Sequence, residues 1–150
     1  MKILSLALAL MLACANSLFS APRDRINPKT LKDKVSITLG TEGTIQFKQN
    51  GNTLAEPKLI KSTDEKEPGV GYKFESHSSG ASETMLLLIV RNHYPKVLRY
   101  RAAMRIKGRK DYVETSIVPV GAGIMSGESW VDPIEELILF DFKLTDEKMQ

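Results

Sequence analysis

Residues 97–107 read Val-Leu-Arg-Tyr-Arg-Ala-Ala-Met-Arg-Ile-Lys, with an apolar side chain at every second position from Leu98 to Ile106. Successive side chains of a β-strand point to opposite faces of the sheet, so this period of two predicts a strand with one face in the core. The other face should carry an aligned row of positive charge. We call that row the basic stripe; its members are Arg99, Arg101, Arg105 and Lys107.

Shorter segments of the same kind occur on both sides of this strand. Period-two alternation recurs in residues 35–39, 44–49, 70–76, 112–118 and 138–144. The unbroken apolar run at residues 85–90 predicts a central strand that is covered on both faces. Asn50-Gly51 predicts a hairpin with a type I′ turn. Asp132-Pro133 supplies a helix cap followed by proline at the first helical position, which predicts one helical turn there.

The spacing of these segments predicts the fold class. About eight short strands with no ten-residue helix between them are typical of an all-β protein, and we expect an antiparallel β-sandwich of immunoglobulin-like topology. The chain has 150 residues, of which 42% are hydrophobic and 26% charged, as in one globular domain. We expect an N-terminal tether at residues 16–34, a single domain at residues 35–145 and a frayed tail at residues 146–150.

The N-terminus has the pattern of an export signal. One lysine precedes the apolar residues 3–13, a run shorter than the roughly 20 residues that span a bilayer. We expect residues 1–15 to be a secretory signal peptide cleaved near Ala15 or Ser17. The single cysteine, Cys14, excludes an intrachain disulfide and lies where a bacterial lipoprotein carries its lipid, which leaves a membrane anchor as an alternative. Since small secreted eukaryotic domains usually depend on disulfides, we expect a bacterial periplasmic or secreted protein.

The sequence contains no recognisable catalytic or cofactor motif. The two histidines, His77 and His93, are not part of any metal-ligand spacing, and no nucleophile motif surrounds the serines. The glycines of residues 121–127 miss the dinucleotide fingerprint by one residue. We therefore expect no enzyme activity, no cofactor and no metal. Aromatic residues make up only 7% of the chain and do not interleave with the basic stripe, so nucleic acid is not an expected partner.

Charge is unevenly distributed although the formal net charge is only +3. Residues 91–110 contain basic but no acidic side chains, and residues 128–150 are mainly acidic. The basic stripe is therefore either a solvated face paired with acidic side chains or a binding surface for an anionic envelope component. Trp130 would anchor an interface if it is exposed and would belong to the core if it is not.

Three functions remain open at this stage. The leading hypothesis is a non-catalytic envelope protein that binds a protein or an anionic envelope component. An alternative is a periplasmic inhibitor or immunity protein that inserts residues 121–127 into the cleft of a hydrolase. A second alternative is a small hydrolase that uses the acidic cluster of Glu128, Asp132, Glu135 and Glu136.

Overall fold

The computed structural model describes residues 23–64, 66–78, 80 and 84–147. The predicted signal peptide and Cys14 lie outside the described residues, as does the end of the predicted tail. The described residues form one 3₁₀ turn, η1 (Pro28–Thr30), and the strands β1 (Arg25–Ile26), β2 (Val35–Thr38), β3 (Thr41–Asn50), β4 (Thr53–Ile60), β5 (Val70–Ser78), β6 (Thr84–Asn92), β7 (Val97–Ile106), β8 (Tyr112–Thr115), β9 (Met125–Trp130) and β10 (Ile134–Thr145).

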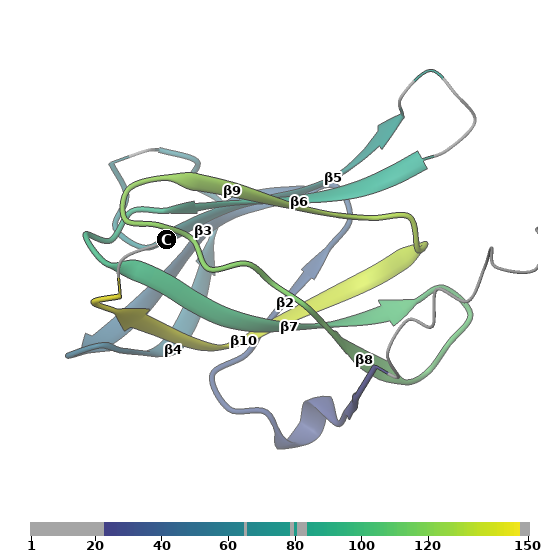
Figure 1. The fold of residues 1–150 in the computed structure, drawn as a ribbon, viewed down its shortest axis with the longest axis horizontal. Helices are drawn as coiled ribbons and strands as arrows, with labels where there is room; N and C mark the ends of the chain where they lie inside the picture. Colours follow the sequence, from purple (N-terminus) through teal and green to yellow (C-terminus); the bar gives the residue numbers. More distant parts are fainter. Residues whose placement is uncertain (1–22, 65, 79, 81–83, 148–150) are drawn as a thin grey trace, which may run out of the picture.

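The strands form one ten-stranded sheet in which all neighbours pair antiparallel. Their order is β1-β8-β7-β10-β4-β3-β5-β6-β9, and β2 also pairs with β10. The sheet folds back on itself, so that β5, β6 and β9 lie above β7, β8 and β10 in Figure 1. The prediction of an all-β, antiparallel protein is confirmed.

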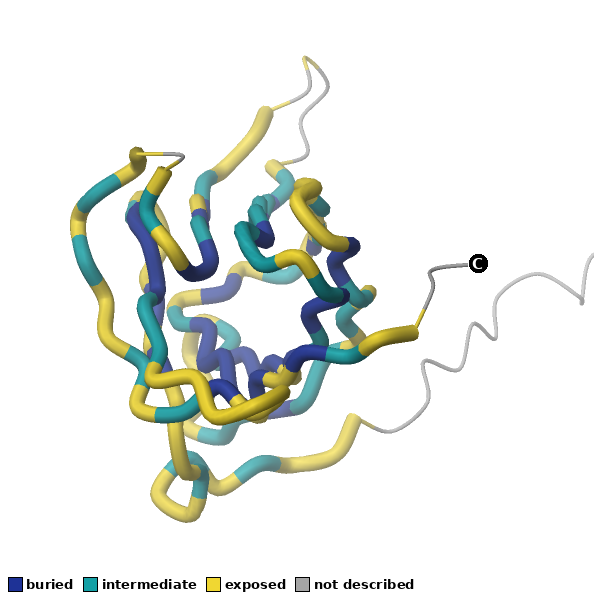
Figure 2. The backbone as a smooth tube through the Cα atoms, turned by 90° about the vertical axis from the view of Figure 1, so that its left-hand side faces the viewer, coloured by how far each residue is buried: buried dark blue, intermediate teal, exposed yellow. Residues whose placement is uncertain are grey.

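The core explains the alternation seen in the sequence. A single cluster of buried residues takes Phe74 and Leu88 from one half of the sheet and Met104 and Leu137 from the other, all four fully buried. In Figure 2 buried and exposed residues follow one another closely along the strands around this core. Each half therefore hides one face against the other, which is the arrangement that period-two strands require.

The long strand β10 is the place where the sheet bends. Its residues 136–139 pair with β2 on one edge, whereas Lys143 pairs with Thr53 of β4. The register against β7 shifts between Phe140 and Lys143, and Asp141 in between has a φ of 55°. Such a bulge bends and twists a strand, and here it carries β10 from one neighbour to the next.

The predicted tether differs from the structure over its second half. Arg25 and Ile26 pair with β8, and η1 is capped by Asn27, whose side chain accepts a hydrogen bond from the backbone N–H of Lys29 at 3.1 Å. Ile26 and Leu31 pack on a second buried cluster, made of Ala103, Ile138 and Phe140, on the outer face of β7 and β10. This part of the chain is thus held to the sheet by apolar contacts. The prolines and mixed charges of residues 16–34 had predicted a tether instead.

Two local predictions need correction. Asn50 pairs with Thr53, so the central hairpin residues are Gly51 and Asn52, of which only Gly51 has a positive φ, at 60°. That pattern matches a type II′ turn, whereas type I′ needs positive φ at both positions. No helical turn forms at Asp132-Pro133, because Ile134 already begins β10.

The run at residues 85–90 does form part of β6, but it is covered on one face only. Leu86, Leu88 and Val90 are buried, while Met85, Leu87 and Ile89 between them are half-buried. β6 has neighbours in the sheet on both sides, and the described residues cover its outer face only in part. The prediction that both faces of this strand are covered was therefore wrong for the outer face.

The finer topology remains a prediction. The consecutive strands β3 to β6 lie next to one another in the sheet, and this order does not establish an immunoglobulin-like arrangement. Within the described ranges, no helix has the length and apolar character that crossing a membrane would require.

Candidate binding surface

Three members of the basic stripe are paired with carboxylates. Arg101 makes a bidentate contact with Glu114 of β8, with Nε and Nη2 each donating to a carboxylate oxygen at 2.7 Å. Arg99 pairs with Glu147, and Arg105 pairs with Glu135 and, at 3.4 Å, with Glu136. The stripe is therefore largely neutralised by β8 and by the acidic C-terminal region.

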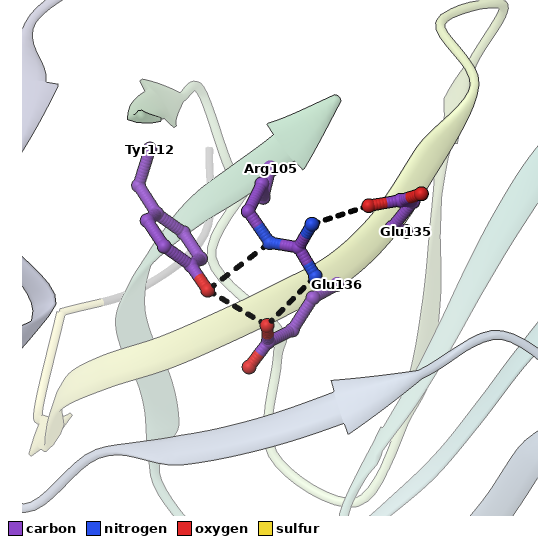
Figure 3. Close-up of polar contacts among 4 residues, drawn as sticks. All are labelled: Arg105, Tyr112, Glu135 and Glu136. Carbon is purple, nitrogen blue, oxygen red and sulfur yellow. Dashed lines mark hydrogen bonds and ion pairs between the residues drawn. The ribbon is translucent and has the colours of Figure 1, made fainter. Parts of the chain in front are cut away.

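The densest of these contacts surrounds Arg105, as Figure 3 shows. Its Nε donates to the hydroxyl oxygen of Tyr112 at 3.3 Å, and that hydroxyl donates to Glu136 at 2.7 Å. The guanidinium also contacts Glu135 on β10. Adjacent strands β7, β8 and β10 each contribute to this network, because the register places Arg105 opposite Glu136. We call it the Arg105 network.

Hydrogen bonding favours the ionised form of two carboxylates that pair with the basic stripe. Burial alone would raise the pKa of Glu136, but hydrogen bonds from Tyr112, Ser36 and Arg105 outweigh it and lower that pKa. The hydrogen bonds from Arg101 lower the pKa of Glu114 in the same way. These groups are suited to holding strands together rather than to donating a proton.

The acidic cluster that could serve a hydrolase is similarly occupied. Glu128 accepts a hydrogen bond from the backbone N–H of Val118 at 2.7 Å, and Asp132 pairs with Arg23 at 3.3 Å. Glu135 and Glu136 belong to the Arg105 network. A glycosidase acid needs a raised pKa, and the pKa of Glu136 is lowered instead.

Trp130 lies in the core. Its side chain is 9% exposed and belongs to the main buried cluster, and its indole N–H donates to the hydroxyl of Thr115 at 2.9 Å. The condition for an interface anchor, exposure, is therefore not met. The bond also joins β9 to the end of β8, on the side of the molecule where the two halves of the sheet meet without strand pairing.

The histidines are far less alike than the sequence suggested. His77 is exposed near the end of β5. His93 is partly buried, and its Nδ1 lies 2.5 Å from the backbone carbonyl oxygen of Glu67. The Nε2 atom of His93 is buried and has no hydrogen-bond partner among the described residues. Those residues contain no cluster of side chains that could hold a metal ion.

Residues 121–124 form a turn that leads into β9, which begins at Met125, and apolar side chains are exposed on this turn and next to it. Ile124 is 51% exposed and Met125 is 55% exposed. Val118, whose backbone is held beside β9 by Glu128, is 54% exposed. We call Val118, Ile124 and Met125 the apolar group.

The turn is anchored by Asn92, a residue that sequence reasoning did not single out. Its buried side-chain amide donates to the carbonyl oxygens of Lys96 at 2.8 Å and of Val120 and Gly121 at 3.0 Å. Its backbone N–H donates to the carbonyl of Ile124 at 2.9 Å. Because these acceptors lie up to 29 residues away along the chain, no local pattern could reveal them.

Comparison with known proteins adds no further information. No family model matches the chain, and no curated protein or solved structure is significantly similar to it.

Proposed function

We propose that this chain is an exported, non-catalytic β-sandwich protein of the bacterial envelope that binds a protein partner through residues 121–127 and Val118. The observation that carries the proposal is the exposure of the apolar group. Ile124 lies on a turn that Asn92 holds in place, Met125 begins β9 directly after it, and the backbone of Val118 is held beside β9 by Glu128. Exposed apolar side chains that are fixed before binding lose little conformational freedom when a partner covers them.

A protein partner is favoured over an anionic polymer by the state of the basic stripe. Arg99, Arg101 and Arg105 each have a carboxylate partner, so an incoming anion would have to displace it. Exposed ion pairs contribute little, but together they remove the net positive potential that would attract a polyanion. The apolar group needs no such displacement.

The inhibitor hypothesis is the second candidate, and it shares the same surface. A loop that blocks an enzyme cleft must protrude and must keep its shape, and residues 121–127 are anchored at Gly121 and Ile124. The hydrolase alternative has less support, because each carboxylate of its acidic cluster is engaged by a neighbouring donor.

The sandwich description is also part of the proposal. Two halves of one sheet that face each other across a shared core support it. The immunoglobulin-like version gains no support from the strand order.

The export part of the proposal depends on residues 1–15 and can be tested separately. Mass spectrometry of the protein produced in a bacterial host should find a mature chain that begins after Ala15 or Ser17. A lipid attached to Cys14 would instead make it an anchored lipoprotein, and an intact Met1 would overturn the proposal of export.

The binding part can be tested by affinity capture from a bacterial envelope extract. Wild-type protein should retain a specific envelope protein, and the double variant Ile124→Asp/Met125→Asp should lose at least about nine-tenths of it, because a charge at the centre of an interface is costly to bury. Leu59→Asp is the matched control, since Leu59 is 43% exposed on β4, outside the apolar group. Equal capture by the double variant and the wild type would refute this surface.

A further inference from the structure

The end of the molecule opposite residues 121–127 contains a cavity of about 760 Å³. It lies where β6 begins and β2 ends, next to the connection between β9 and β10, and Lys107 lies at its edge. Its volume is within the range of about 300–1,000 Å³ that is usual for sites that bind small molecules.

The wall of the cavity combines apolar residues that continue the core with the threonines Thr38 and Thr84 and three charged residues. Leu86 and Ile134, both buried members of the main cluster, line it from opposite halves of the sheet. Leu39 and Val131 are also lining residues, and they are 42% and 71% exposed. An apolar chain that enters between the two halves would therefore cover side chains that water now reaches.

The charges at the cavity favour an anion. Two acidic residues line it, but Asp132 is paired with Arg23 and Glu135 with Arg105. Lys107 is the lining cation, and its ammonium group has no carboxylate partner within the part of the chain that the structure describes. Unlike the other three members of the basic stripe, Lys107 thus has no carboxylate partner among the described residues, and it lies next to exposed apolar side chains.

We propose that this cavity binds a single-chain fatty carboxylate. The alkyl chain would lie against Leu39, Leu86 and Ile134, and the carboxylate would pair with the ammonium group of Lys107. This site lies beyond the proposed function, because it uses the opposite end of the strands and none of the apolar group. The unbranched alkyl chain matches the apolar lining residues, and the single anionic end matches Lys107.

The proposal can be tested by isothermal titration of the mature protein with dodecanoate at pH 8, below the concentration at which micelles form. At that pH dodecanoate is ionised. Dodecanoate should bind with a dissociation constant in the micromolar range. Shortening the chain to decanoate and octanoate should weaken binding by about fourfold for each methylene group that is lost, as expected for burial of CH₂.

Variants and analogues separate the contributions of charge and chain. Lys107→Gln should weaken dodecanoate binding about tenfold and leave dodecanol binding unchanged. Lys110→Gln, an exposed lysine of the adjacent turn that does not line the cavity, is the matched control and should have no effect. Met125→Asp should also bind dodecanoate normally, which keeps a failure here distinct from a failure of the proposed protein interface.

Three results would overturn the proposal. If Lys107→Gln binds dodecanoate as tightly as the wild type, the assigned cation is wrong. If dodecanol binds more tightly than dodecanoate, the occupant is a neutral chain. If no alkyl compound binds to the wild type, the cavity is not a site for a fatty carboxylate. Circular dichroism of each variant checks that the fold is intact.

Discussion

The two ends of the sheet are secured in different ways. At one end the buried amide of Asn92 ties together the carbonyls of Lys96, Val120 and Gly121, so the connection before β7 and the turn before β9 are fixed to each other. At the other end the interior opens into the cavity beside Val131. There the strands are joined on the outer face by the Arg105 network. We call these the Asn92 end and the cavity end.

The difference is between buried neutral hydrogen bonds and partly exposed charged ones. A buried polar group that is left without a hydrogen-bond partner costs its full desolvation free energy. An exposed ion pair contributes less, because water and salt screen it. The Asn92 end should therefore be the more stable, and the contribution of the Asn92 amide should be insensitive to pH and salt. The cavity end should depend on the ionisation of Glu136 and leaves apolar surface available to a ligand.

The largest effect is expected at the Asn92 end. Asn92→Ala removes the amide from three carbonyl oxygens, of which that of Val120 keeps the N–H of Leu98, and it creates a small void, so the free energy of unfolding should fall by about 2 kcal/mol. Urea denaturation followed by circular dichroism measures the change. Asn50→Ala, at the exposed end of β3, is the control and should change the free energy by less than about 0.5 kcal/mol.

The comparison between the ends fails if Asn92→Ala and Asn50→Ala are equally mild. Such a result would mean that water replaces the amide at the three carbonyls. The penalty of Asn92→Ala should also be constant between pH 3 and pH 8, since neither the amide nor its carbonyl partners titrate in that range.

A smaller, pH-dependent effect is expected at the cavity end. Tyr112→Phe removes the hydroxyl that donates to Glu136, and at pH 7 it should lower the free energy of unfolding by about 1 kcal/mol. Because the pKa of Glu136 is lowered in the folded state, its contribution is present above the ordinary carboxyl pKa and is lost as the pH falls through the folded value. The difference between wild type and Tyr112→Phe should therefore shrink below about pH 4.5.

Urea titrations at a series of pH values between 3 and 8 measure this convergence. Tyr94→Phe is a suitable control, because burial alone raises the pKa of the Tyr94 hydroxyl and no carboxylate among the residues described contributes. If the penalty of Tyr112→Phe were the same at pH 3 and pH 7, the hydroxyl would stabilise the fold without acting through Glu136.

The sequence was informative where structure depends on neighbouring residues. Alternation located most of the strands but not β1 or β9, and the spacing of Arg99, Arg101 and Arg105 placed them correctly on the outer face of β7. The hairpin at Gly51 was found as well, with its centre displaced by one residue. Each of these features follows from side-chain direction and backbone preference over a few positions.

The features that distinguish the two ends could not be found in this way. Arg105 meets Glu135 across 30 positions of sequence, and Asn92 meets Gly121 across 29. Both contacts depend on which strands become neighbours, and local alternation says nothing about strand order. For the same reason the pairing of the basic stripe remained an open alternative, and the cavity was not foreseen.

The smallest effect is expected from an ion pair at the Asn92 end. Arg99 and Glu147 are both largely exposed, so Arg99→Gln should change the free energy of unfolding by less than about 0.5 kcal/mol. Even that change should vanish in 1 M NaCl, where the screening length is about 3 Å. A double-mutant cycle with Glu147→Gln, measured by urea denaturation, isolates the pair. A coupling that exceeds the penalty of Asn92→Ala would mean that charge, rather than the buried amide, holds this end closed; a weak coupling leaves Asn92 as its main support.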